Sequence, residues 1–101
     1  MVAKVYQVVW TSRSKSNLKQ VYDYISEESP KSALKVVEGI ANAVYKANKN
    51  PEIYGPDKYK INNDGSYRAF EKHRYRVAYR FNKNTIRVLR VRHTSQKPLK
   101  Y

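Results

Sequence analysis

The sequence predicts a small α+β domain in which one strand and two adjacent helices precede a three-stranded antiparallel meander. Three observations predict it: two-residue alternation near both ends of the chain, three- and four-residue apolar spacing between them, and turn-forming residues at the boundaries. A chain of 101 residues can bury one hydrophobic core but not two, so we expect residues 1–101 to form a single domain. We expect the helices on one face of the sheet and the other face partly open.

The first strand is expected over Lys4–Trp10. Tyr6, Val8 and Trp10 alternate there with a second set that is also mostly apolar. Apolar residues on both sides are typical of a strand covered on both faces.

Two helices are expected next. The hydroxyl residues at positions 11–14 are candidate N-caps for a helix that ends near Glu28, and Ser29-Pro30 is a cap followed by proline at the first helical position of another. Because the two helices are adjacent in the chain, they predict an antiparallel hairpin. The apolar stripes that support them are Leu18, Val21, Tyr22 and Ile25 in the first helix, and Ala33, Val37, Ile40, Val44 and Ala47 in the second.

The remainder reads as a long connection, a meander and a tail. Residues 48–66 are rich in Asn, Gly and Pro, which predicts a loop, and long loops often carry function. Strands are expected over Tyr67–Glu71, Tyr75–Phe81 and Thr85–Arg92, with hairpin turns between them. The last residues, 93–101, show no periodicity.

Positive charge is concentrated in the C-terminal third. Residues 67–101 hold 11 of the 21 Lys and Arg residues against one acid, Glu71, and the chain carries a formal net charge of +13. In the Tyr75–Phe81 strand the apolar positions alternate with Arg76, Ala78 and Arg80, so the arginines share one face. Such a face suits contact with a polyanion, and an ordinary solvated face is the competing interpretation.

Composition excludes several classes of chemistry. The chain has no cysteine, which excludes disulfides and thiol catalysis, and its two histidines and scattered acids lack the spacing of a zinc site. We therefore expect no metal and no cofactor. No apolar stretch approaches the roughly 20 residues of a transmembrane helix, and no signal-peptide pattern is present, so we expect no membrane attachment and a cytoplasmic location.

The order of these elements, with specific motifs, resembles the RelE/ParE toxin superfamily of bacterial type II toxin–antitoxin systems. The motifs are the strand Tyr75-Arg76-Val77-Ala78-Tyr79 and, about ten residues later, the apolar strand that leads into Arg92-His93. The resemblance covers nearly the whole chain. It implies a growth-inhibiting toxin with a cognate antitoxin, and the charge of +13 favours an acidic one.

The superfamily contains two activities. Some members are ribosome-dependent endoribonucleases that cut mRNA in the ribosomal A site, and others inhibit DNA gyrase without cutting nucleic acid. The partners implied are therefore the ribosome and mRNA, or alternatively DNA gyrase.

Cleavage of RNA without a metal needs a base, an acid and cations that stabilise charge on the phosphate. By similarity to the ribonucleases, Arg76 is the candidate phosphate-contacting residue, Arg68 a basic residue on the preceding strand, His93 an acid or base, and Tyr101 a C-terminal tyrosine that stacks on a base or transfers a proton. A surface histidine and a frayed terminal tyrosine are the competing interpretations of the last two. Further candidate nucleic-acid contacts are Lys58, Lys60, Arg74, Arg80, Arg92 and Lys97.

Two positions depart from the ribonuclease pattern. Phe70 occupies a position that is basic in that branch, and Ser95 aligns with an arginine that some members carry. A missing cation removes stabilisation of the transition state, although Arg92 or Lys97 could compensate. The sequence favours ribosome-dependent mRNA cleavage and leaves open both gyrase inhibition and a binding module without toxicity.

Overall fold

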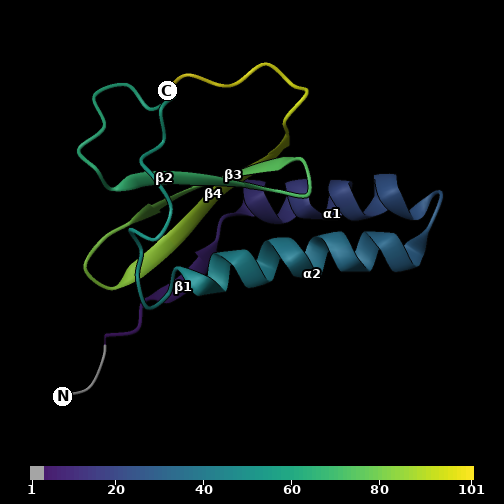
Figure 1. The fold of residues 1–101 in the computed structure, drawn as a ribbon, viewed down its shortest axis with the longest axis horizontal. Coiled ribbons are helices and arrows are strands. Elements are labelled where there is room, and N and C mark those ends of the chain that lie inside the picture. Colours follow the sequence, from purple (N-terminus) through teal and green to yellow (C-terminus); the bar gives the residue numbers. More distant parts are fainter. Residues whose placement is uncertain (1–3) are drawn as a thin grey trace.

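The computed structural model describes residues 4–101 as a four-stranded sheet with a two-helix hairpin on one face (Figure 1). In chain order the elements are β1 (Gln7–Trp10), α1 (Ser12–Ser26), α2 (Pro30–Lys46), β2 (Tyr67–Lys72), β3 (Tyr75–Phe81) and β4 (Thr85–His93). The strand order is β1-β4-β3-β2, in which β1 runs parallel to β4 and the other neighbours are antiparallel. The predicted α+β class and the order of elements are confirmed.

Strand β1 is shorter than predicted and lies at the edge of the sheet. It begins at Gln7 and pairs only with β4. Val8 and Trp10 pack against the core, but Val9 points to the face away from the helices and stays partly exposed. The prediction of a strand covered on both faces was therefore wrong, because both helices of the described chain lie on the same side (Figure 1).

Both helices begin at caps that the sequence predicted. The Thr11 hydroxyl accepts a hydrogen bond from the Ser14 N–H at 3.1 Å. The Ser29 hydroxyl accepts one from the Ser32 N–H at 3.1 Å, and Pro30 takes the first helical position. Within residues 4–101, neither helix is both long and apolar enough to cross a bilayer.

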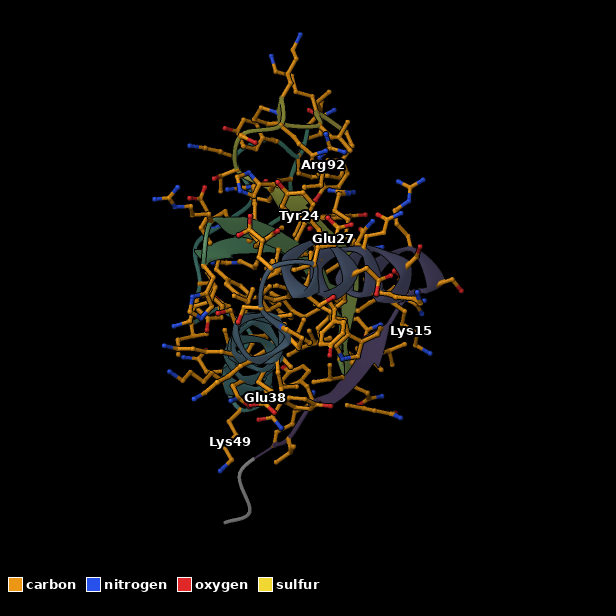
Figure 2. The ribbon with its side chains drawn as sticks, turned by 90° about the vertical axis from the view of Figure 1, so that its right-hand side faces the viewer. Lys15, Tyr24, Glu27, Glu38, Lys49 and Arg92 are labelled. Carbon is orange, nitrogen blue, oxygen red and sulfur yellow. The ribbon has the colours of Figure 1, made fainter. Side chains whose placement is uncertain are left out.

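The core lies between the helical hairpin and the inner face of the sheet. Ile40 and Val44 of α2 belong to the same buried cluster as Val77 of β3 and Val88 of β4. The predicted stripe of α2 therefore faces the sheet. Figure 2 shows the molecule from the side, with Glu38 of α2 and Arg92 of β4 far apart on opposite sides of this packed interior.

Strand β4 contains a bulge that the sequence analysis did not predict. The pairing between β3 and β4 shifts by one residue after Ala78, which leaves Leu89 without a partner on β3. Val88 and Val91 are both buried, although in a regular strand residues three apart point to opposite faces. The bulge brings both valines into the core and leaves Arg90, the partner of Ala78, on the outer face.

The connection between α2 and β2 covers the free edge of β2. Asp57 donates its backbone N–H to the Tyr67 carbonyl at 2.8 Å. The Tyr54 ring stacks on Phe70 with 4.3 Å between centroids, and its hydroxyl donates to the Ala43 carbonyl at 2.7 Å. A covered edge cannot pair with another chain. Phe70 is thus a core residue that anchors the loop.

Candidate functional site

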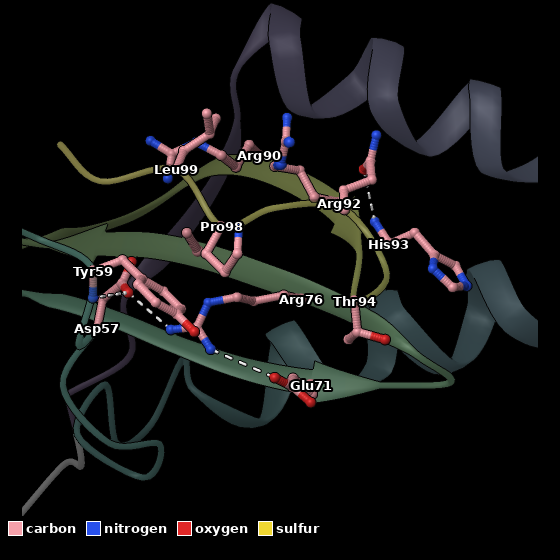
Figure 3. Close-up of a pocket in the computed structure, with 12 residues that line it drawn as sticks. Asp57, Tyr59, Glu71, Arg76, Arg90, Arg92, His93, Thr94, Pro98 and Leu99 are labelled. Atoms are coloured by element: carbon pink, nitrogen blue, oxygen red, sulfur yellow. Dashed lines mark hydrogen bonds and ion pairs between the residues drawn. The ribbon is translucent and has the colours of Figure 1, made fainter.

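The outer face of the sheet, the α2–β2 loop and the C-terminal tail enclose a small cavity (Figure 3). Residues 94–101 return across this face to the loop, as the yellow trace in Figure 1 shows. The cavity has a volume of about 70 Å³, too small for a nucleotide while the tail is in place. It is lined by Asp57, Tyr59, Glu71, Arg76, Ala78, Arg90, Arg92, His93, Thr94, Gln96, Pro98 and Leu99.

Arg76 is committed to interactions within the protein. Its Nη2 lies 2.8 Å from Oδ1 of Asp57, and its Nη1 lies 3.6 Å from Oε2 of Glu71, its neighbour on β2. The guanidinium also lies over the Tyr59 ring, 4.7 Å from the centroid. Two carboxylates therefore lie beside this guanidinium, and they compensate its positive charge within the protein.

Asp57 is the centre of this cluster and is only 2% exposed. Besides the Arg76 bond, its Oδ1 accepts the Tyr59 N–H at 3.0 Å and its Oδ2 accepts the Tyr101 hydroxyl at 2.7 Å. Burial alone would raise the pKa of this carboxyl, but the bonds from Tyr101, Arg76 and the Tyr59 N–H together hold the pKa below its usual value. Asp57 is therefore ionised at neutral pH.

Tyr101 is held on both its backbone and its side chain. Its N–H donates to the Tyr59 carbonyl at 3.1 Å and its carbonyl accepts from the Ile61 N–H. Burial, and then the bond to the Asp57 carboxylate, raise the pKa of the Tyr101 hydroxyl to about 12. Tyr101 is therefore ordered, and not frayed as the competing interpretation had it, and a phenol with this pKa stays protonated at neutral pH.

The His93 ring lies on the opposite face of the sheet from Arg76, although the residue also borders the cavity. His93 pairs with Tyr75, and the two rings meet edge to face with 5.1 Å between centroids. Its Nδ1 accepts the Ser95 N–H at 3.0 Å, which holds the ring in place. Ser95, which departs from the arginine of the ribonuclease pattern, therefore has a structural contact here. Figure 3 shows the imidazole directed away from Arg76. The structure does not bring these two candidate catalytic residues together.

Arg68 is a loop anchor in this structure. It is paired with Tyr79 and lies on the helix-facing side of β2, not on the face of Arg76. Its Nε donates to the Gly65 carbonyl at 2.8 Å and its Nη1 to the Tyr54 carbonyl at 3.2 Å. A side chain that is 13% exposed and already bonded to two carbonyls offers few donors to a ligand.

Three of the predicted nucleic-acid contacts gather around tyrosines beside Asp57. Lys60 lies over the Tyr67 ring at 4.7 Å, and Arg80 lies over the same ring at 4.9 Å. Lys58 lies 5.3 Å from the centroid of the Tyr59 ring. Cations near exposed aromatic rings are a common surface for single-stranded nucleic acid, and they are also ordinary cation–π pairs.

The other three predicted contacts are dispersed. Arg92 lines the cavity and donates to the Lys97 carbonyl at 3.2 Å, and Lys97 itself is exposed on the tail. Arg74 lies in the β2–β3 turn, where its carbonyl accepts the Thr94 N–H at 2.8 Å. Both it and His73 have positive φ, 70° and 51°, as a two-residue hairpin turn requires.

Two residues at this site, Asp57 and Arg90, were not among those predicted from the sequence. Asp57 stands in a loop, residues 48–66, whose three acids are balanced by three lysines, so neither its charge nor its spacing singled it out. Arg90 was counted only as part of the charge, although its guanidinium lies over the Tyr101 ring at 4.0 Å. The bulge in β4 determines which way it points.

The candidate catalytic residues are engaged in separate contacts in this structure. Arg76 is ion-paired, Tyr101 is bound to a carboxylate, and the His93 ring points away from Arg76. Proton transfer needs the acid and the base within hydrogen-bond reach of one substrate. The outer face instead offers cations of β4 for binding.

Comparisons with known proteins agree on one fold. The model of a family described as the ParE toxin of the type II toxin–antitoxin system, parDE, matches residues 8–98. A chain of the chromosomal ParDE TA system from P. aeruginosa superposes with a TM-score of 0.70 and 20% identity over 89% of this chain and 97% of that one. No curated protein matches the chain by sequence.

Two further solved structures are similar. The toxin–antitoxin complex RelBE2 from Mycobacterium tuberculosis gives a TM-score of 0.62 at 17% identity, covering 91% of this chain and 94% of that chain. The YoeB dimer from Staphylococcus aureus gives 0.58 at 16% identity, covering 87% and 95%. At these identities the likeness shows the fold alone.

Proposed function

The chain belongs to the family of ParE toxins of type II toxin–antitoxin systems, and on that premise we propose that it arrests growth by binding and inhibiting DNA gyrase. The RelE/ParE membership that the sequence predicted is confirmed. Membership makes the chain a toxin of such a system, whereas the target of the toxin is our proposal.

The observation that carries the proposal is the pairing of Arg76 with Asp57 at 2.8 Å. A phosphate in transfer needs a cation whose charge is available in the transition state. Here that charge is already compensated, and His93 faces the other side of the sheet. A toxin that acts by occupying a surface of its target needs neither group. On this ground we prefer gyrase inhibition to the mRNA cleavage that the sequence favoured.

Ribosome-dependent mRNA cleavage is the second candidate, and one feature favours it. Arg90 and Arg92 face the cavity without any carboxylate partner among the described residues. If the ribosome displaced the tail, Tyr101 would leave Asp57, and these cations would be accessible to RNA. The two candidates therefore differ in whether the tail must move.

The test combines two measurements on the same protein. The purified chain is added to DNA gyrase and relaxed plasmid, and in parallel mRNA 5′ ends are mapped within minutes of inducing the toxin in cells. Gyrase inhibition predicts blocked supercoiling and an unchanged set of 5′ ends. New ends in register with codons, together with normal supercoiling at saturating toxin, would refute it.

A single substitution of Arg76 is a poor control because Arg76 pairs with the buried Asp57 and supports the fold. Arg76→Ala alone would leave the Asp57 carboxylate buried without its cation, so lost toxicity could reflect unfolding. The double variant Asp57→Asn with Arg76→Gln removes both charges together and keeps hydrogen-bonding groups in place. We expect this folded double variant to retain gyrase inhibition, whereas an RNA-cleaving toxin would lose its activity with Arg76.

We further propose that an acidic antitoxin neutralises the chain. The net charge of +13 supports this, since it attracts an anionic partner over long distances. If the gene adjacent to that of the toxin encodes an acidic protein, co-expression of the two should restore growth. Continued growth arrest with both proteins present at equal abundance would argue against that partner.

A further inference from the structure

A second polar site lies where the start of α1 meets the end of β4. Strand β4 has nine residues and its partner β1 has four, so the second half of β4 has no strand beside it on that side. The first turns of α1 take this place. The Asn17 Oδ1 accepts the Val91 N–H at 3.0 Å, and the Thr11 hydroxyl donates to the Leu89 carbonyl at 3.2 Å.

Three arginines converge on this junction. A hollow of about 280 Å³ is lined by Arg13 of α1, by Arg90 and Arg92 of β4, by Asn17 and by Leu99 of the tail. No carboxylate lines it, and the ion pairs of residues 4–101 involve none of these arginines. Like charges held together repel, so the site is electrostatically unfavourable until an anion enters.

The donors around the hollow are already oriented. The Arg92 Nη2 donates to the Lys97 carbonyl at 3.2 Å, and the Arg90 guanidinium is stacked on the Tyr101 ring at 4.0 Å. The Arg90 Nε is buried and has no hydrogen-bond partner within residues 4–101. Because the Asn17 oxygen is occupied by Val91, its NH₂ group remains as a donor. Figure 3 shows Arg90, Arg92 and Leu99 on the same side of the cavity.

We propose that Arg13, Asn17, Arg90 and Arg92 form a binding site for a backbone phosphate of a nucleic acid. Guanidinium groups present paired donors that match phosphate oxygens, and an amide donor adds to them. A polyanion fits better than a free phosphate because the cationic surface continues along the outer face. Arg87 of β4 is exposed and lies opposite Arg80 of β3. The site does not depend on Arg76 or on the target of the toxin.

The test measures binding to the purified full-length chain by fluorescence anisotropy. The probes are a labelled duplex DNA and a labelled single-stranded RNA, and inorganic phosphate is the competitor. Arg13→Gln and Arg92→Gln should each weaken oligonucleotide binding by about tenfold, the loss of one charge-assisted hydrogen bond. Each should also lower the salt dependence by about one phosphate contact.

Lys15→Gln is the matched control for Arg13→Gln. Lys15 lies two residues along the same helix, is exposed, and does not line the hollow, and Figure 2 shows it well away from Arg92. Lys15→Gln removes the same charge, so any additional loss of oligonucleotide binding in Arg13→Gln is due to the site. Equal weakening by the two variants would overturn the proposal in favour of unspecific attraction.

A second variant guards against loss of the fold. Asn17→Asp keeps an acceptor for the Val91 N–H and puts a carboxylate among the arginines. It should abolish binding while thermal stability is kept. Unchanged oligonucleotide binding in Asn17→Asp would refute the site. If the protein bound inorganic phosphate but neither of the two oligonucleotides, the assignment of the site to nucleic acid would be refuted. Gyrase inhibition measured in the same variants tests the proposed function separately.

Discussion

Replacing Asp57 with asparagine should destabilise the protein by about 2–3 kcal/mol at pH 7. The carboxylate accepts three hydrogen bonds, from Arg76, Tyr101 and the Tyr59 N–H, at 2.8, 2.7 and 3.0 Å. An asparagine keeps one acceptor oxygen and puts an NH₂ donor opposite the Tyr101 hydroxyl, so the hydrogen bonds lose their ionic character and Arg76 loses its nearest counter-charge, at a cost of about 2–3 kcal/mol. The avoided cost of burying a carboxylate offsets part of this loss.

The assay is urea unfolding followed by the fluorescence of Trp10, the single tryptophan. The expected loss is a large part of the roughly 5–15 kcal/mol that stabilises a typical domain. Asp23→Asn is the control, because this exposed carboxylate pairs only with Lys19 on the same helix. Its unfolding midpoint should stay close to that of the parent protein.

The pH dependence gives an independent check. The pKa of Asp57 is lower in the folded protein than its ordinary value of about 3.9. Its stabilisation is therefore fully present above the unfolded-state pKa and is lost as the pH falls through the folded-state pKa. The unfolding free energies of the parent and of Asp57→Asn should converge below about pH 4. Equal stability at pH 7, or a difference that persists unchanged into acid, would refute this reasoning.

Three further predictions concern single side chains. Tyr101→Phe should lower the free energy of unfolding by about 1 kcal/mol at pH 7. Because the pKa of Tyr101 is raised to about 12 in the folded protein, the stability difference between parent and variant should disappear as the pH rises above about 10. Urea unfolding midpoints measured across that pH range test this. Arg74→Gly should stabilise the hairpin by about 1 kcal/mol, since φ is 70° there, and a lower melting temperature would contradict it. Arg68→Ala should cost about 2 kcal/mol and speed proteolysis of the α2–β2 loop, because its bonds to the carbonyls of Gly65 and Tyr54 are lost; an equally resistant loop would show that other contacts hold it.

Some features of the site were within reach of the sequence. Phe70 is a core residue, and Arg68 is two positions before it, so alternation alone places both side chains on the same face of β2. Similarly, Val88 and Val91 cannot both face the core of a regular strand, and their spacing indicates a bulge. The shared face of Arg68 and Phe70 was therefore predictable, although Arg68 was assigned by its charge alone.

Other features depended on contacts between distant residues. Asp57 lies in a loop without periodicity, and its partners Arg76 and Tyr101 are 19 and 44 residues further along the chain. Sequence spacing contains no information about such a pair. Arg13 likewise joins Arg90 and Arg92 only because α1 takes the place of the missing strand beside β4.

By itself, the sequence determined the order of strands and helices, the apolar stripe of α2 and the concentration of positive charge beyond Tyr67. These are local properties, set by residues a few positions apart and by composition. Only the tertiary structure decided which cations are free. It pairs Arg76 with a buried acid, bonds Arg68 to a loop and leaves Arg92 facing a hollow without carboxylates. Whether a charge is neutralised depends on which groups folding brings within a few ångströms of it. Such proximity between distant residues cannot be predicted from the periodicity of the chain.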